Sequence, residues 1–504
     1  MKKTQMVTVI ALVVAMLVMA LPAYAADPNP GEGNTDVVVT NTNQNTGAAP
    51  ASVTALYYSQ GGVPEYDRTN TINSRGSRNF KASDAQLGDN WKGSMVVQSD
   101  AELAAVAEIH WTGGSHSDGK EADAYTGYSQ GASDMLFPFV ALAPNAQYTM
   151  LTIQNTEASA INIQMTYVNR DGQTDFANIA DTIPAFGSKS YAMKDAGTNN
   201  VPNLRGTAFW AANGTWVGAV KVTAQNSKKI AAVASNFWTQ YSVGYNALTG
   251  GAQTSYVPSV ERRMSGSNWS TGVWSGFSVI VVQCVSATPC QVAIDFINAG
   301  TGQTSLTLPT LTVAPGAAIG ANTRSGGQYD PNVIATGLGN AWAGSAVVRS
   351  TNSTNLGVIS YSIRPSNNEA GGTSAATVQG GGLETFLPVV YQKNTQNVSC
   401  PSSDSAWTIF SLLRIQNPGT VNATNVDIYY FNTDGSMAVQ NLDQSIQAGK
   451  SINRNTRVNC STIPLNGNWT GSVYIRSDQP LVAVVENLWG SAEMAAYNGY
   501  SVTR

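Results

Sequence analysis

Apolar and polar residues alternate along much of the chain with a period of two, which is typical of β-strands that cover a core with one face. Val473 and Ile475 share one face of such a run, whereas Tyr474 and Arg476 share the other. Polar turns such as Asn432–Gly435 separate these runs, and Asp-Gly pairs tolerate the positive φ of tight hairpins. We find no run of helical period long enough to predict a helix. The pattern predicts an all-β protein.

A Trp-x-Gly-small tetrad occurs four times and is the clearest sign of an internal repeat. Successive tryptophans lie 125, 126 and 127 residues apart. Counting in twos along the following strand places the tryptophan on the apolar face, so we expect each to be a core anchor that removes on the order of 200 Å² from water. The four tryptophans are Trp91, Trp216, Trp342 and Trp469.

Other marks recur at the same places in the repeat. An x-Pro-x-Val opening stands at Pro138, Pro258 and Pro388. A run rich in Ala and Val follows each tetrad, and a further tryptophan comes after it in three copies, as Trp111, Trp238 and Trp489; the third copy lacks it. The first copy lacks the proline opening. We therefore interpret repeat 1 as the divergent copy.

The repeat divides the chain into domains. About seven short strands in each copy favour an immunoglobulin-like β-sandwich over a barrel, and we expect four tandem sandwiches in an extended array. The expected divisions are a signal peptide over 1–25, a flexible leader over 26–35, repeat 1 over 36–130, repeat 2 over 135–250, repeat 3 over 254–380 and repeat 4 over 384–504.

The first residues predict export. Lys2 and Lys3 form a positive start, Val7–Leu21 an apolar run, and Ala23–Ala25 a small-x-small cleavage site. The alternative is a membrane anchor, but the run falls short of the roughly 20 residues that span a bilayer. We expect a mature chain from Ala26, secreted to the extracellular space or cell surface, with no transmembrane segment.

Charge is sparse in this sequence. Charged residues make up 12 % of the chain, against about 25 % in ordinary soluble proteins, and the net charge is −4. Such a chain offers no basic field to nucleic acid or anionic lipid, so neither is an expected partner. The exterior should be neutral and rich in hydrogen-bonding side chains.

Four cysteines in an exported chain are expected to pair. Cys284 and Cys290 flank a short turn in repeat 3, and Cys400 and Cys460 both lie in repeat 4. Pairing within each repeat is favoured over the other two connectivities. Metal ligation by these cysteines is the less favoured alternative.

Candidates for catalysis or metal binding are few. The only two histidines, His110 and His116, lie near Asp118 and Asp123, a set that offers nitrogen and oxygen ligands. A solvated loop is the favoured reading of this segment. No phosphate-binding glycine loop precedes a helix. We expect neither a metal nor a cofactor.

Paired carboxylates could hydrolyse glycosides without histidine. Glu108 and Glu486 occupy the same repeat position, but Ser235 and Tyr361 replace them in repeats 2 and 3. Because a scattered set of this kind does not suggest a catalytic pair, we expect no enzyme. Glycoside hydrolysis is the third hypothesis.

Tryptophans outside the tetrads could stack on sugar rings. Trp269, Trp274 and Trp407 lie in segments that lead into the first strand of repeats 3 and 4. Packing against the core is the favoured reading, and carbohydrate binding is the alternative function.

The combination of motifs resembles a known kind of protein. The x-Pro-x-Val openings, the Leu-x-Ile-Gln-Asn strands at Leu151 and Leu413, and the Tyr-Asn-Gly ending resemble tandem β-sandwich repeats of uncharacterised surface proteins of filamentous Chloroflexota-type bacteria. Repeat 3 departs from them, with Ala376-Thr-Val-Gln-Gly-Gly in place of the ending. The resemblance implies a cell-surface or extracellular-matrix role and no catalytic residues. We expect a structural or adhesive protein of a fibre, sheath or coat, partnered by itself, other envelope proteins or a polysaccharide.

Overall fold

The computed structural model describes residues 27–45, 47–81, 85–88, 90–113, 121–365, 369–374, 376–377, 381–490 and 493–502. The chain is all-β, with antiparallel strands throughout and short helices only in connections. None of the helices in these ranges has the length and apolar character needed to cross a membrane. His116 and Asp118, two of the residues considered as metal ligands, lie outside the described residues.

Repeat 2 shows the complete plan. Its opening strand, β8, pairs with β13 along most of its length and with β9 at its end, which joins the repeat into one continuous sheet. The strands are β8 (Asp134–Ala143), β9 (Gln147–Asn155), β10 (Ile161–Asn169), β11 (Thr174–Ile183), β12 (Ser188–Ala192), β13 (Trp216–Ala224), β14 (Ile230–Trp238) and β15 (Ser242–Asn246). The connections hold α2 (Ala208–Asn213) and 3₁₀ turns at Met193–Asp195, Leu204–Gly206 and Gln225–Ser227.

Repeats 3 and 4 follow the same plan, with β16 and β27 as opening strands. Repeat 3 holds β16 (Thr254–Ser265), β17 (Val273–Cys284), β18 (Cys290–Asn298), β19 (Thr304–Thr307), β20 (Leu311–Val313), β21 (Ala318–Asn322), β22 (Gly326–Gly327), α3 (Pro331–Leu338), β23 (Ala341–Ser350), β24 (Leu356–Arg364), β25 (Glu369–Ser374) and β26 (Ala376–Thr377). Repeat 4 holds β27 (Gly382–Asn394), a 3₁₀ turn at Asp404–Ala406, β28 (Trp407–Gln416), β29 (Ala423–Asn432), β30 (Met437–Ile446), β31 (Ser451–Asn455), β32 (Asn468–Trp489), β33 (Glu493–Asn498) and β34 (Tyr500–Val502).

Repeat 1 differs from the other three because it forms two separate sheets. One has the order β4-β1-β6-β7 and the other the order β3-β2-β5. The strands are β1 (Gly31–Asn41), β2 (Ala51–Ser59), β3 (Pro64–Ile72), β4 (Ser77–Lys81), β5 (Gly93–Ser99), β6 (Leu103–Gly113) and β7 (Glu121–Thr126). β1 begins at Gly31, so half of the segment expected to be a flexible leader, residues 31–35, belongs to a strand.

The tetrad tryptophans lie on the core side of their strands. Trp216, Trp342 and Trp469 are 0 %, 4 % and 3 % exposed, whereas Trp91 is only partly buried. The glycine two residues later is required by space. A Cβ at Gly218 would lie 2.2 Å from the carbonyl oxygen of Val168 and 2.8 Å from the Trp216 ring.

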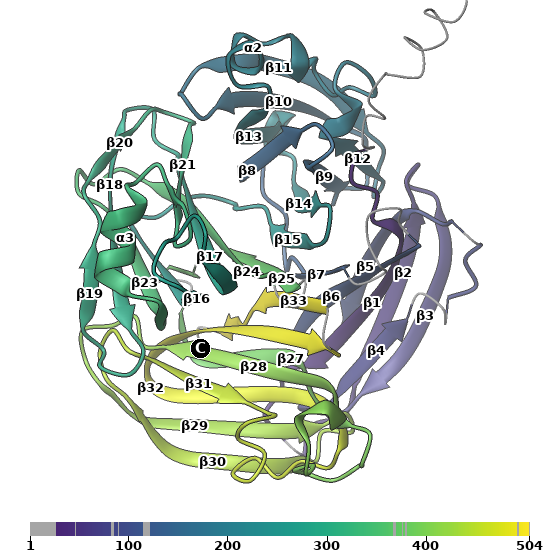
Figure 1. Cartoon of the computed structure of the whole chain (residues 1–504). Coiled ribbons are helices and arrows are strands. Elements are labelled where there is room, and N and C mark those ends of the chain that lie inside the picture. Colours follow the sequence, from purple (N-terminus) through teal and green to yellow (C-terminus); the bar gives the residue numbers. More distant parts are fainter. Residues whose placement is uncertain are drawn as a thin grey trace, which may run out of the picture.

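The prediction of an extended array is wrong, because the four repeats close into a ring (Figure 1). At each of the four contacts, a glycine in the same tight turn of one repeat, always with positive φ, lies against a turn of the next. Three contacts join repeats that follow one another in sequence, and the fourth joins repeat 4 back to repeat 1. The pairs are Gly62 with Ala185, Gly172 with Ala314, Gly302 with Lys450 and Gly435 with Ser74.

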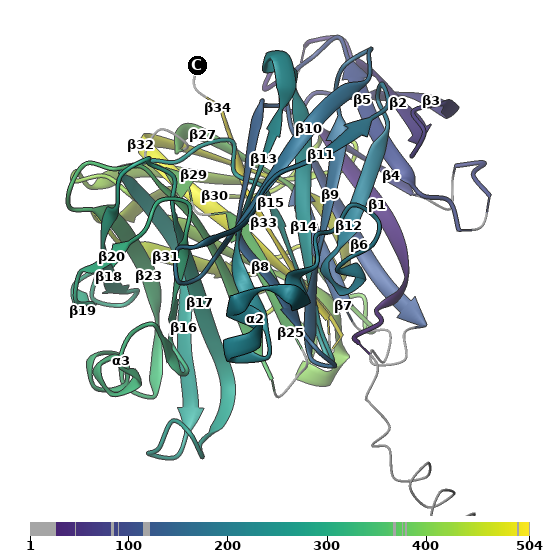
Figure 2. The same cartoon turned by 90° about the horizontal axis from the view of Figure 1, so that it is seen from above.

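The last full strand of each repeat lies at the centre of the ring, where β7, β15, β25 and β33 meet (Figures 1 and 2). Small residues allow the close approach: a Cβ at Gly371 would lie 3.0 Å from the Cβ of Ala496, and one at Gly244 would lie 2.9 Å from the Cβ of Asp123. The outer faces of these strands are thus buried against other repeats. In an extended array of separate domains, the outer faces of these four strands would be exposed to water.

Candidate functional site

Glu108, one of the two carboxylates considered for glycoside hydrolysis, lies across from Asp36 of strand β1. It is buried between repeats 1 and 4, where its carboxylate accepts hydrogen bonds from Tyr391 Oη and Asn487 Nδ2, both at 2.7 Å. Burial raises the pKa of Glu108, and the two hydrogen bonds oppose that rise. Both hydrogen-bond donors to this carboxylate belong to repeat 4, so Glu108 links repeats 1 and 4.

Glu486, at the same position of repeat 4, is buried against repeat 3. Its carboxylate accepts from Arg364 Nη2 at 2.6 Å and from Ser259 Oγ at 2.7 Å. Burial alone would raise the pKa of Glu486, but the charges of Arg364 and Arg414 lower it to about 2. The carboxylate is therefore held ionised and paired.

The guanidinium of Arg364 is the centre of a buried charge cluster. Besides Glu486, it lies 2.9 Å from Glu261 Oε1 and 3.6 Å from Glu369 Oε2. These carboxylates raise the pKa of Arg364, although burial works against them. The sequence signal for this cluster was the missing tryptophan of repeat 3, since Arg364 occupies the place of Trp111, Trp238 and Trp489.

The two remaining residues of the Glu108 position are also at repeat interfaces. Tyr361 of repeat 3 stacks on Phe139 of repeat 2, with ring centroids 5.6 Å apart, and lies 5.8 Å from Trp238. Ser235 of repeat 2 lies beside the Asp123 carboxylate of repeat 1. All four residues at this position contact the preceding repeat of the ring. This position therefore lies at the interfaces between repeats.

Asp123 and His110, two of the four residues considered as metal ligands, bond to different partners. Asp123 accepts from Trp111 Nε1 at 3.4 Å, and burial raises its pKa to about 6. His110 Nδ1 lies 3.0 Å from Glu493 Oε2; burial would lower the pKa of His110, but Glu493 raises it. Among the described residues, no group of three His, Cys, Asp or Glu side chains is placed to hold a metal ion.

The tryptophans considered for sugar stacking lie against the protein. Trp274 is 5 % and Trp407 8 % exposed, and Trp269 is partly buried against the core. Trp274 Nε1 donates to the Trp269 carbonyl oxygen at 3.1 Å, and the guanidinium of Arg262 lies 5.2 Å from the Trp274 ring centroid. The guanidinium of Arg262 thus lies over the Trp274 ring, where a sugar would have to stack.

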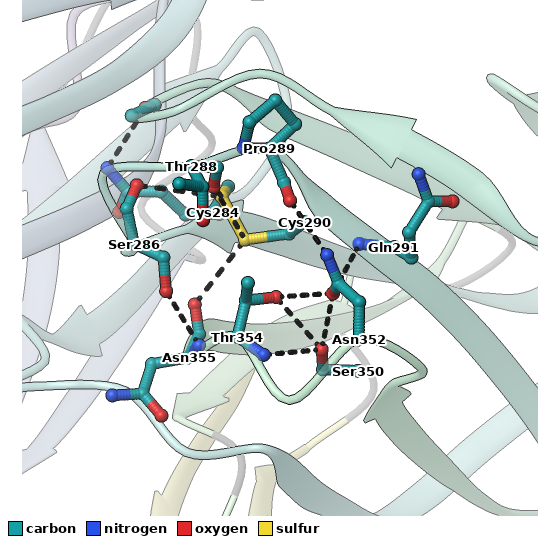
Figure 3. Close-up of a disulfide and its surroundings, with 12 residues drawn as sticks. Cys284, Ser286, Thr288, Pro289, Cys290, Gln291, Ser350, Asn352, Thr354 and Asn355 are labelled. Atoms are coloured by element: carbon teal, nitrogen blue, oxygen red, sulfur yellow. Dashed lines mark hydrogen bonds between the residues drawn. A yellow bond between two sulfur atoms is a disulfide. The ribbon is translucent and has the colours of Figure 1, made fainter.

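Both disulfides join cysteines of one repeat. Cys400 is bonded to Cys460, and Cys284 to Cys290 (Figure 3). Beside the second bond, Asn352 fixes the same turn: its Oδ1 accepts from Gln291 N at 3.0 Å, and its Nδ2 donates to Pro289 O at 2.9 Å. The bonds close loops within repeats 3 and 4 and do not link repeats. Disulfides of this kind persist in oxidising compartments.

An open groove of about 560 Å³ lies between repeats 1 and 2. Gln60 and Gly61 line one side; the other side carries Asp181, which accepts from Lys189 Nζ at 2.8 Å and from Tyr191 Oη at 2.9 Å. Asn199 and Asn200 add amide groups. Its hydrogen-bonding groups could hold a neutral polar ligand, but the Tyr191 ring is buried and offers no stacking surface.

No family model matches this chain, and no curated protein is a recognisable relative. Among solved structures, Thermotoga maritima 1070 aligns over 24 % of this chain and 96 % of its own, with 21 % identity and a TM-score of 0.19. Anabaena sensory rhodopsin transducer aligns over 21 % and 97 %, with 16 % identity and a TM-score of 0.16.

A tetra-tandem repeat in the extending region of a large adhesion protein aligns over 91 % of this chain and 94 % of its own, with 11 % identity and a TM-score of 0.11. These similarities are too low to carry an argument about function. The function must be inferred from the chain itself.

Proposed function

We propose that this chain is a non-catalytic extracellular structural or adhesive surface protein. Its four repeats, each of immunoglobulin-like β-sandwich character, would act as one rigid block of a fibre, sheath or coat. The observation that carries the proposal is the use of the buried polar groups: the carboxylates first considered for chemistry, Glu108 and Glu486, are engaged in contacts between repeats.

The exterior supports this role. On β3, β11 and β30 about half of the exposed positions carry Thr, Asn, Gln or Asp, which can hydrogen-bond, and most of the others carry uncharged residues such as Ala and Leu. A sparsely charged exterior suits lasting contact with other envelope proteins or polysaccharide better than rapid electrostatic capture of a charged partner. The disulfides support an oxidising compartment, as the expected signal peptide does.

The test is localisation combined with electron microscopy of the native material. We expect the protein in the cell-envelope or matrix fraction, and regular assemblies in which the ring is the repeating unit. A chain that stays monomeric at high concentration and is absent from both fractions would contradict the proposal. Arg364→Met, which should weaken the ring, is the matched control: it should reduce assembly together with stability.

Carbohydrate binding is the second candidate, and the groove between repeats 1 and 2 favours it. In a polysaccharide pull-down, Asn199→Ala with Asn200→Ala should reduce retention at least severalfold, because a polar site that loses its partners rejects its ligand. Trp269→Ala and Trp407→Ala are the comparison pair for stacking. Retention unchanged in all variants would exclude both locations.

A further inference from the structure

Among the described residues, repeat 1 has no counterpart of the opening strand that completes the other three repeats. In repeats 2, 3 and 4 that strand is β8, β16 or β27, and it pairs with the tetrad strand. In repeat 1 the tetrad strand β5 pairs with β2 alone, so among the described residues its second edge is open. This missing strand is also why repeat 1 has two sheets where the others have one.

The open edge leaves apolar side chains incompletely covered. Met95 and Val97 point toward the core of repeat 1 but are only partly buried, whereas their counterparts Val220 and Val222 are fully buried under β8. At the start of β1, Asn34 is exposed where its counterpart Tyr148 is buried. The same surface is covered in three repeats and uncovered in one.

Repeat 1 retains a tyrosine that, in other repeats, hydrogen-bonds the opening strand. In repeats 2 and 4, a tyrosine of the last full strand donates to the carbonyl of the residue after the opening proline: Tyr245 Oη to Phe139 O at 2.6 Å, and Tyr497 Oη to Val389 O. Tyr125 holds that position in repeat 1, as the strand register requires. Among the described residues, repeat 1 has no opening-strand carbonyl for Tyr125.

No described segment of the chain fills the place. Before β1 the backbone leads to repeat 2, where Asp27 Oδ1 accepts from Asn145 N at 3.0 Å. If the signal peptide is removed after Ala25, as the sequence predicts, the five residues 26–30 that precede β1 are too few for a strand the length of β8. A second copy is no better donor, because β8, β16 and β27 are each buried within their own repeat.

We propose that the open edge of β5 accepts an extended segment of a partner protein by antiparallel strand addition. This inference rests on the proposed surface function and gives it a kind of partner. The segment would be about ten residues long, with apolar side chains on its inner face and a proline near its middle, as in β8. There Phe137, Val140 and Leu142 are fully buried. Main-chain hydrogen bonds would give affinity, and the inner side chains specificity.

The test uses a synthetic peptide with the sequence of Asp134–Ala143 and a lysine tail for solubility, added to the mature full-length protein. Val96→Cys provides a thiol on the outer face of β5. The register of β8 on β13 predicts that Val96 lies opposite the peptide position of Leu136, since Leu136 pairs with Lys221. A peptide with cysteine there should form the disulfide roughly tenfold more than peptides with cysteine at the Met135 or Phe137 position, because a one-residue shift reverses the face.

Lys221→Cys is the matched control, because its edge is already occupied by β8. We expect little cross-linking there and strong cross-linking at Val96→Cys. Equal yields at both sites, or no preference among the three peptides, would overturn the proposal. Cross-linking between copies without peptide, or protection of Val96→Cys only in the uncleaved precursor, would also overturn it by identifying another occupant. Register-specific cross-linking without assembly at the cell surface would contradict the proposed function but would still support strand addition at β5.

Discussion

Repeats 1 and 2 carry the same Trp-x-Gly tetrad, yet Trp216 of repeat 2 is fully buried and Trp91 of repeat 1 is half-buried. Trp216 also donates from Nε1 to Asp175 at 2.7 Å, whereas the Trp91 indole N–H is held by Glu65 at the surface. The difference is β8, which covers the core of repeat 2 and has no described counterpart in repeat 1. A motif specifies the face on which a residue lies, but a neighbouring strand determines how deeply it is buried.

The largest expected effect sets these two tryptophans against each other. Trp216→Ala should destabilise the protein by about 3–5 kcal/mol, the usual cost of emptying a core position of an aromatic ring. Trp91→Ala should cost about 1–2 kcal/mol, because part of its surface is already in water. Urea unfolding of both variants measures the difference, with Trp342→Ala expected to match Trp216→Ala. Equal losses at Trp91 and Trp216 would mean that repeat 1 is as well covered as repeat 2.

A second comparison opposes the charged and the neutral repeat interface. Arg364→Met should cost about 3–5 kcal/mol, since it leaves buried carboxylates without their cation. Glu108→Gln should cost about 1–3 kcal/mol, because its partners Tyr391 and Asn487 are neutral. Thermal unfolding of both variants provides the measurement. Arg349→Met, whose side chain is 43 % exposed, should lose less than about 1 kcal/mol.

The interface of repeats 3 and 4, which holds Glu486, and the interface of repeats 1 and 2, which holds Asp123, should respond to pH in opposite directions. Glu486 has a lowered pKa of about 2, so its contribution is complete above about pH 4.5, the ordinary value, and is lost as the pH falls toward 2. Asp123 has a raised pKa of about 6, so folding stability falls as the pH rises from about 4 through 6, by about 3 kcal/mol in total.

Urea unfolding between pH 2 and 8 tests both signs. Glu486→Gln should remove the loss at low pH, and Asp123→Asn should remove the loss above pH 4. A profile for Asp123→Asn that parallels the parent chain would show that this carboxyl does not govern the interface between repeats 1 and 2.

The smallest expected effect concerns the hydroxyl that fastens the opening strand. Thr149 Oγ1 accepts from Ala141 N of β8 at 2.9 Å and donates to Asn236 Oδ1. Thr149→Val should therefore cost about 1–2 kcal/mol. Thr35 occupies the same position of repeat 1, where no β8 counterpart is described, and Thr35→Val should cost less than about 0.5 kcal/mol. A loss at Thr35 as large as at Thr149 would indicate that a strand already lies there.

Period-two alternation and tight-turn chemistry were enough to predict an all-β chain, because both act locally. The arrangement of the repeats was not predictable in this way. β7, β15, β25 and β33 are short and rich in Ala, Gly and Ser, and such residues give no strong pattern; yet their smallness is what lets four repeats meet.

The candidate residues show a similar limit. The repeated position of Glu108 and Glu486 was visible in the sequence, but its role at the interfaces depends on partners more than 120 residues away, such as Arg364 for Glu486 and Tyr391 for Glu108. The absence of a tryptophan in repeat 3 marked the place of Arg364. What the sequence could not reveal was that three carboxylates from separate strands converge on it.

Closure of the ring has a mechanical consequence. Three of its four contacts are backed by peptide bonds, whereas the contact of repeat 4 with repeat 1 rests on non-covalent groups such as Gly435 against Ser74 and Glu108 with Tyr391. Tension applied to the two chain ends would load that contact first. A block of this construction would yield by opening into a longer chain of four folded repeats, extending its reach before any repeat unravels.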